Sequence, residues 1–170
     1  FGEGGGKRVA EELDVPWADV TFEFASAHDA YGMMVTGGST AVMESWEPLR
    51  QAGATARWML REAAAQRWGI SSELLATRDA RVCAPDGSEL TYASLASEAA
   101  KLQAPNKVDV KKPSEFRLIG QSLPRLDVEA KSTGQAVFGI DAGPPDARVA
   151  VIARSPVFGG RLRSFDSSAA

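Results

Sequence analysis

The residues best suited to bind a ligand form a glycine and hydroxyl turn, made of Gly37, Gly38, Ser39 and Thr40. Two glycines let the backbone approach a ligand closely, and a helix that begins directly afterwards offers unpaired N–H groups and a positive dipole end. Such a turn suits a phosphate or pyrophosphate group. The residues equally suit an ordinary turn with a Ser or Thr helix cap. That is the simpler interpretation, because the pattern is of neither the Walker nor the dinucleotide-binding type.

Few other residues suggest chemistry. His28 beside Asp29 resembles an acid–base pair, but no nucleophile can be paired with it, so we interpret it as an exposed loop histidine. The single cysteine, Cys83, excludes an internal disulfide and any four-thiolate iron–sulfur or zinc site. The run Gly2–Gly6 could cradle a phosphate, yet its composition favours a flexible linker. We assign no catalytic residue and no metal ligand.

Two groups of charged residues are interpreted as solvated. Glu11, Glu12 and Asp14 form an acidic helix face, and Lys111 with Lys112 make a linker soluble. The formal net charge of −3 argues against a nucleic-acid partner, because phosphate backbones require a concentrated basic field.

Hydrophobic periodicity predicts the elements that position the glycine turn. A helix ends near Leu13, residues 20–24 alternate as a strand, and a helix with a kink or restart at Pro48 covers residues 41–68 before Gly69 stops it. The expected elements that follow are a short capped helix at 71–75, a hairpin of residues 81–84 and 89–91, and a helix that Thr91 caps and that ends near Leu102.

The second part of the chain differs in composition. Residues 103–115 are rich in proline and charge, which predicts a linker between a segment at 1–102 and another at 116–170. Beyond the linker we expect a short helix near 127–131 and strands at 135–141, 147–153 and 161–165. The fold class is therefore α/β (α+β), with a long helix packed on short strands in the first segment.

The bulk composition is that of a globular protein, with 170 residues, 44% hydrophobic and 24% charged. No apolar run reaches the roughly 20 residues that span a bilayer. The start at Phe1 has no apolar core like that of a signal peptide, and we expect the chain to be a cut piece or edited chain. One thiol is compatible with the cytosol and the periplasm alike.

Two stretches resemble a known family. Residues 116–141 followed by 149–156 are similar to the opening of the hammerhead domain of the aldehyde oxidase/xanthine dehydrogenase superfamily. The matching positions are Gly120, Arg125, Asp127, Lys131, Gly134, Ala136, Asp141, Ser155 and Pro156. Residues 9–17, with 30–32, 36–42 and 45–50, resemble part of the molybdopterin-binding domain of the isoquinoline 1-oxidoreductase β-subunit group, in which such a segment precedes the hammerhead domain.

The resemblance implies a molybdenum hydroxylase large subunit, which hydroxylates aldehydes or N-heterocycles with oxygen from water. It implies a molybdopterin cofactor in the full-length protein, contacted by Gly37, Gly38, Ser39 and Thr40, and a partner subunit that carries iron–sulfur clusters. The single cysteine agrees with clusters on another chain.

Departures from the family limit what this chain should do alone. The Gly-Gln-Gly motif of the family is absent from residues 2–7, and no segment matches the motif that carries its catalytic glutamate. We therefore expect a fragment that is inactive in isolation, that packs on the remaining large-subunit domains, and that self-associates through exposed apolar surface. The alternatives are a binding or assembly module without catalysis, and an unrelated small enzyme with an anion pocket at residues 37–40.

Overall fold

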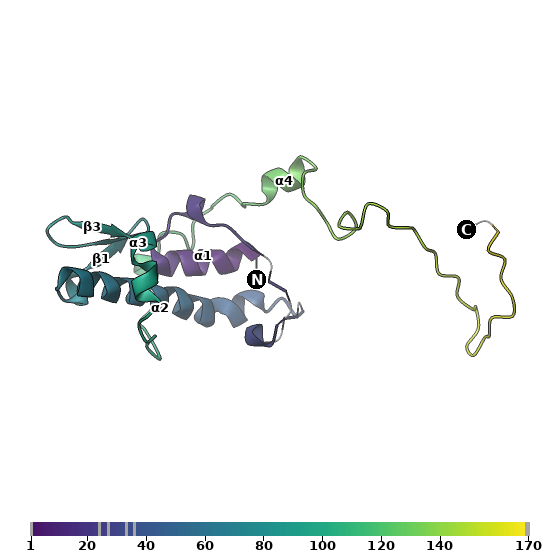
Figure 1. The fold of residues 1–170 in the computed structure, drawn as a ribbon, viewed down its shortest axis with the longest axis horizontal. Coiled ribbons are helices and arrows are strands. Elements are labelled where there is room, and N and C mark those ends of the chain that lie inside the picture. The colour runs from purple at the N-terminus through teal and green to yellow at the C-terminus, as the bar shows by residue number, and fades with distance from the viewer. Residues whose placement is uncertain (1, 24, 27, 33, 36, 169–170) are drawn as a thin grey trace. The chain divides into compact units, whose positions relative to one another are not determined.

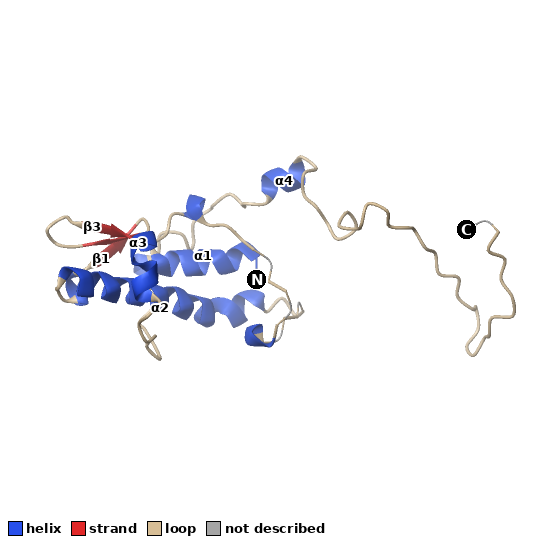
Figure 2. Cartoon of the chain, viewed as in Figure 1, coloured by secondary structure: helices blue, strands red, loops and turns tan. Residues whose placement is uncertain are grey.

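A computed structural model describes residues 2–23, 25–26, 28–32, 34–35 and 37–168 (Figure 1). The chain divides into two compact units, residues 1–126 and residues 127–170. The first unit combines helices with a three-stranded antiparallel sheet, which confirms the predicted α+β class (Figure 2).

The first unit is built on two helices that lie side by side, α1 (Gly2–Leu13) and α2 (Ala41–Trp68). They run in the same direction, since Arg8 contacts Ser45 while Glu12, one turn later, contacts Arg50 (Figure 1). Gly53 permits the close approach, because a Cβ there would lie 2.8 Å from the carbonyl oxygen of Val9. The two helix N-termini consequently share one end of the unit.

Helix α2 is continuous, and the predicted restart at Pro48 does not occur. Proline removes one hydrogen bond from a helix, and the long packed interface with α1 outweighs that loss. The predicted stop at Gly69 is confirmed. This glycine adopts a left-handed φ of 69°, and its N–H donates to the carbonyl oxygen of Ala65 at 2.8 Å.

The sheet follows α2 in the sequence and packs beside its C-terminal part. It consists of β1 (Ala76–Arg78), β2 (Arg81–Cys83) and β3 (Glu89–Thr91), in that spatial order. The β2–β3 hairpin was predicted, whereas the three-residue β1 was not. Thr91 caps α3 (Tyr92–Ala99) by accepting from the N–H of Ser94, as expected. The core contains Leu60, Ala63, Ala64, Ala65, Leu75, Val82, Leu95 and Ala99.

The described part of the first unit also contains four short 3-10 helices: Trp17–Asp19, Asp29–Tyr31, Ser72–Leu74 and Pro113–Glu115. The third of these is the predicted capped turn, with the hydroxyl of Ser71 accepting from the N–H of Glu73. Residues 103–115, predicted as a linker, lie within the first unit, and the boundary between units falls after Leu126.

Two N-terminal expectations are wrong. The glycine run 2–6 is the first half of α1 rather than a linker, since packing against α2 offsets the poor helix propensity of glycine. Residues 20–23 form no strand, because no described segment pairs with them, and Phe24 lies outside the described residues.

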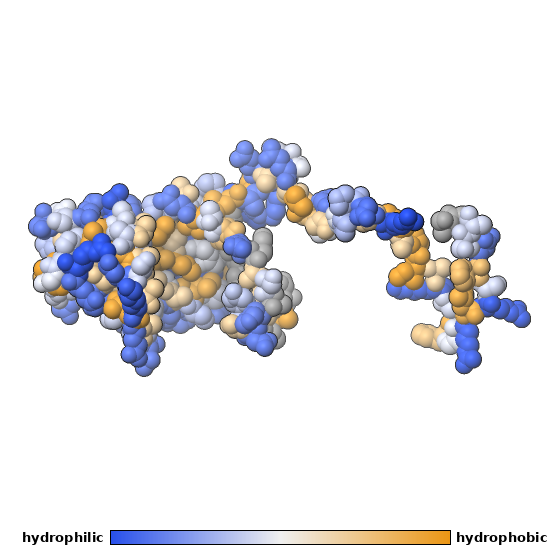
Figure 3. All heavy atoms as spheres, in the orientation of Figure 1, coloured by the Kyte–Doolittle hydropathy of each residue, from blue (hydrophilic) through white to orange (hydrophobic). Residues whose placement is uncertain are grey.

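The second unit contains α4 (Val128–Ser132), which agrees with the helix predicted near 127–131. The strands predicted at 135–141, 147–153 and 161–165 do not form among the described residues. Apolar side chains of this unit are exposed, as the orange stretches in Figure 3 show; they include Val137, Ile140, Val149, Val151, Ile152, Phe158, Leu162 and Phe165. A strand requires a hydrogen-bonded neighbour, and the described residues provide none. The predicted start of a hammerhead α/β domain is therefore represented only by α4 and an extended chain.

Candidate functional site

The predicted ligand turn lies at the start of α2 and is exposed. Gly38 and Ser39 both adopt left-handed backbone conformations, with φ of 59° and 56°. Thr40 occupies the N-cap position, but its hydroxyl caps no helical N–H and instead donates to the carbonyl oxygen of Gly37 at 3.5 Å. A Cβ placed on Gly37 would meet nothing within 4 Å, so a ligand can approach the backbone there.

The turn leads into backbone N–H groups that α2 itself cannot use. The first helical hydrogen bond runs from the N–H of Glu44 to the carbonyl oxygen of Thr40, so the preceding amides have no acceptor within the helix. The N-terminus of α1 lies at the same end (Figure 1). Because both helix dipoles point their positive ends there, this end of the unit favours an anion. Glu44, in the first turn of α2, opposes this field.

Arg8 of α1 lies close to the same end and is buried, with 5% of its surface exposed. Its Nη1 donates to the hydroxyl of Ser45 at 3.0 Å, and its guanidinium lies 5.6 Å from the ring centroid of Trp46. Its Nε is buried and has no hydrogen-bond partner. Burial lowers the pKa of Arg8 below its ordinary value.

His28 is an exposed loop histidine, as predicted. Its Nδ1 accepts from the N–H of Ala30 at 3.1 Å, and its ring packs edge-on against Tyr31 with centroids 6.2 Å apart. The imidazole therefore caps the short helix Asp29–Tyr31. Nothing in this arrangement supports a role as a catalytic base.

The acidic group of α1 is buried, which corrects the prediction of a solvated face. The carboxylate of Glu11 accepts from the backbone N–H groups of Arg117, Leu118 and Ile119, at 2.7 to 3.1 Å. Burial raises the pKa of Glu11, but the hydrogen bonds from Ile119, Leu118 and Arg117, together with the charge of Lys111, lower it below its ordinary value. Glu11 therefore stays ionised and fastens residues 117–119 to α1.

Glu12 and Asp14 complete a compensated charge cluster with Lys111, which was predicted to be a solubilising linker residue. Glu12 accepts from Nε of Arg50 at 2.9 Å and from the N–H of Lys111 at 3.0 Å. The ammonium of Lys111 donates to Asp14 at 2.5 Å and, with 8% of its side chain exposed, is buried. Arg57 contributes ion pairs of 3.7 Å to Glu12 and 3.6 Å to Asp14.

This cluster is structural rather than catalytic, because its carboxylate oxygens are already bound by cations and backbone amides. A signal for it exists in the sequence. Arg50, Gly53 and Arg57 follow one another at spacings of three and four residues, which places two cations and a small residue on one stripe of α2. Such a stripe matches a neighbouring helix that carries acids. The contact between Glu12 and Lys111 has no such signal, because the two residues lie 99 positions apart in the sequence.

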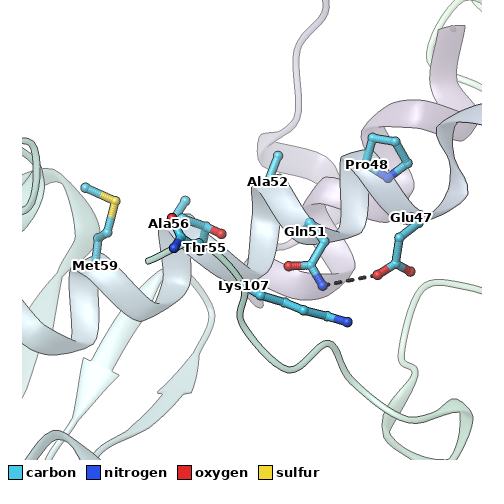
Figure 4. A pocket seen from close by; sticks show the side chains of 9 residues that line it. Glu47, Pro48, Gln51, Ala52, Thr55, Ala56, Met59 and Lys107 are labelled. Atoms are coloured by element: carbon cyan, nitrogen blue, oxygen red, sulfur yellow. Dashed lines mark hydrogen bonds between the residues drawn. The ribbon is translucent and has the colours of Figure 1, made fainter. Parts of the chain in front are cut away.

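A shallow groove of about 710 Å³ runs along α2 (Figure 4). The side chain of Lys107 extends along it toward Gln51, whose amide donates to Glu47 at 3.2 Å. The described residues contain no group of three or more His, Cys, Asp or Glu side chains that could hold a metal ion. Nor does any described helix have the length and apolarity required to cross a membrane.

No protein-family model matches the sequence. The chain is similar to three curated proteins. It is 31% identical over 169 residues to a protein of Gluconacetobacter polyoxogenes named membrane-bound aldehyde dehydrogenase [pyrroloquinoline-quinone], with 95% of this chain covered. It is 34% identical over 152 residues, 89% of this chain, to a protein of Pseudomonas putida that is named as one of the subunits of nicotinate dehydrogenase.

The third relative is the β-subunit of isoquinoline 1-oxidoreductase from Brevundimonas diminuta, 29% identical over 204 aligned positions that cover 95% of this chain. The chain spans only 22%, 13% and 26% of the lengths of the three relatives. Two of these relatives are named as subunits of larger enzymes. The resemblance seen in the sequence is thereby confirmed: most of this chain is similar, at 29–34% identity, to three members of the molybdenum hydroxylase family.

Proposed function

We propose that this chain forms part of a molybdenum hydroxylase large subunit that oxidises aldehydes or N-heterocycles. In this proposal the turn made by residues 37–40 contacts the anionic part of a molybdopterin cofactor. The observation that carries the proposal is the exposed turn, with its left-handed Gly38 and Ser39, at an end where two parallel helices both begin.

The described residues fit one part of that cofactor. Phosphate oxygens can accept hydrogen bonds from several groups at this turn. These groups are the amides in the first turn of α2 and the hydroxyls of Ser39 and Thr40, and the open backbone at Gly37 leaves room for the phosphate. They offer no ligand set for the metal, because no cluster of metal-binding side chains is present among the described residues. When bound, the molybdenum cofactor supplies the oxidation chemistry. The role proposed for this chain is to bind and orient its anionic group.

The name of one relative specifies pyrroloquinoline quinone, which is also a polyanion. The chemistry shared by the two cofactors is an anionic group at the N-terminal ends of α1 and α2. Elemental analysis for molybdenum and extraction of bound quinone therefore form the two arms of the test. The molybdenum arm is the one that the resemblance at residues 116–141 favours.

Incorporation into a larger subunit also accounts for the exposed apolar residues of the second unit. Side chains such as Val149, Val151 and Ile152 alternate or cluster as they do in a buried strand, yet more than three quarters of the surface of each is exposed. The proposed partners are the remaining domains of the large subunit and, in the complex, a small iron–sulfur subunit. A binding or assembly module without catalysis is the alternative, and it would use the same surfaces.

The proposal is tested by purifying the native oxidoreductase that contains this chain. The expected result is stoichiometric molybdenum and dye-linked oxidation of an aldehyde or N-heterocycle, while the isolated 170-residue chain shows neither. A quinone in place of molybdenum would contradict the cofactor assignment. Association of the chain with an enzyme that keeps full activity when the chain is removed would support the module instead. Turnover by the isolated chain would contradict the proposed fragment role.

A further inference from the structure

Arg8 is a buried cation of α1 that the charge cluster between α1 and α2 leaves uncompensated. Glu11, Glu12 and Asp14 are matched by Lys111, Arg50 and Arg57. Among the side chains that the structure describes, Arg8 makes no ion pair with a carboxylate, and its Nη1 donates to the neutral hydroxyl of Ser45. A buried cation without an anion is strongly destabilising, so its presence calls for a reason.

The guanidinium of Arg8 is directed toward the helix N-termini. Helical side chains lean toward the turn that precedes them. A Cβ on Gly4 would accordingly lie 3.9 Å from both Nη1 and Nη2 of Arg8. On α2, the hydroxyl of Ser45 that accepts from Arg8 itself donates to the carbonyl oxygen of Ala41, the first residue of that helix. The cation therefore lies level with the first turns of both helices.

Three features converge at this end of the unit: two positive helix ends, the open turn at residues 37–40, and a buried arginine with an unpartnered Nε. The stacking of Trp46 on the guanidinium at 5.6 Å holds Arg8 in place without neutralising it. An anion with several oxygen atoms would neutralise Arg8 and accept from its free N–H groups.

We propose that Arg8 is an anion-binding residue that holds a phosphate or pyrophosphate group at the shared N-terminal end of α1 and α2. This inference rests on the proposed function only for the identity of the molecule that carries the phosphate. Arg8 extends the site from an exposed turn to a partly buried one, because it contributes a fixed positive charge from α1.

The test uses the full chain and inorganic pyrophosphate as the probe. Pyrophosphate is expected to raise the melting temperature of the wild-type chain and to shift the amide resonances of Gly37 and Gly38, together with the Nε resonance of Arg8. In Arg8→Met the dissociation constant should rise by about tenfold or more, since hydrogen bonds to charged groups are lost. The matched control is Lys7→Met, which removes a neighbouring cation of α1 whose ammonium lies over the ring of Trp17, 5.5 Å from its centroid.

Arg8 as an anion ligand and Arg8 as a purely structural residue predict opposite changes in the melting temperature of the free chain. If Arg8 is an anion ligand, Arg8→Met leaves the free chain as stable as the wild type or more stable, because an uncompensated buried charge is removed. If Arg8 is only structural, the variant melts at a lower temperature and binds pyrophosphate as the wild type does. An unchanged Nε resonance in the wild type at saturating pyrophosphate also overturns the inference, and this holds even if the variant fails to fold.

The outcomes separate the inference from the proposed function. A native enzyme that contains molybdenum in equal amounts with and without Arg8→Met retains the function and overturns the role of Arg8. A chain that binds pyrophosphate through Arg8, in an enzyme that contains no molybdenum, retains the role of Arg8 and overturns the cofactor assignment.

Discussion

The carboxylate of Glu12 accepts a hydrogen bond of 2.9 Å from Nε of Arg50, and both side chains are buried where α1 packs on α2. This pair fixes the register of two parallel helices, and with it the meeting of their N-termini. The candidate anion site therefore depends on a charge pair that lies about one turn beyond Arg8.

Replacement of Glu12 by Gln should lower the free energy of unfolding by about 3–5 kcal/mol, because Arg50 is left buried without its partner. Urea denaturation measures the change. The matched control is Glu98→Gln, which breaks the half-exposed pair with Arg67 and should cost about 0–1 kcal/mol. Equal losses in the two variants would show that the buried pair contributes no more than a surface one.

Glu11 should make stability depend on pH in the acid range. Its pKa is lowered in the folded chain below the ordinary value of 4.5, so its contribution is fully present above that value and is lost as pH falls through the folded pKa. The free energy of unfolding should decrease below about pH 4.5, and less steeply in Glu11→Gln. Exposed Glu129 provides the control, and a slope unchanged in Glu11→Gln would contradict the role of the amides at residues 117–119.

Gly53 should tolerate no side chain. In Gly53→Ala the new Cβ would lie 2.8 Å from the carbonyl oxygen of Val9 and 2.9 Å from Cβ of Glu12. The helices must separate, at a cost of about 1–3 kcal/mol that exceeds the gain of about 1 kcal/mol in helix propensity. Ala52→Gly, on the exposed side of α2, should lose only the propensity difference. Stabilisation by Gly53→Ala in thermal unfolding would show that the helices are less closely packed.

A chain shortened to residues 1–126 should melt at the same temperature as the full chain, because the core lies entirely within the first unit. Removal of residues 127–170 should also reduce binding of a hydrophobic dye and any concentration-dependent association, since the exposed apolar side chains of the second unit are lost. Light scattering that shows equal association of the two chains would place the associating surface in the first unit.

The sequence was sufficient for elements whose signals are local. The stop of α2 at Gly69, the cap at Thr91 and the β2–β3 hairpin each follow from residues within a few positions of one another. The glycine turn was also placed correctly before α2, although its role as a cofactor contact stays a prediction.

The errors concern contacts between distant residues. The sequence predicts Glu11 and Lys111 to be solvated, because nothing in the local sequence of either residue indicates a partner 100 positions away. Strands at 135–141 and 147–153 were predicted from alternation alone, and alternation does not supply the neighbouring strand that a sheet requires. No local sequence pattern marks Arg8, since its burial depends on the parallel packing of α1 against α2.

Two charge substitutions, made in the larger enzyme that is proposed to contain this chain, test the cofactor contact at residues 37–40. Ser39→Asp puts a carboxylate in the turn at the start of α2, at a backbone conformation that aspartate tolerates, whereas Ser71→Asp makes the same change at an exposed cap elsewhere. We expect molybdenum per large subunit to fall by about tenfold in Ser39→Asp, because the new charge repels the anionic cofactor, and to stay at the wild-type level in Ser71→Asp. Equal molybdenum contents in the two variants would contradict it.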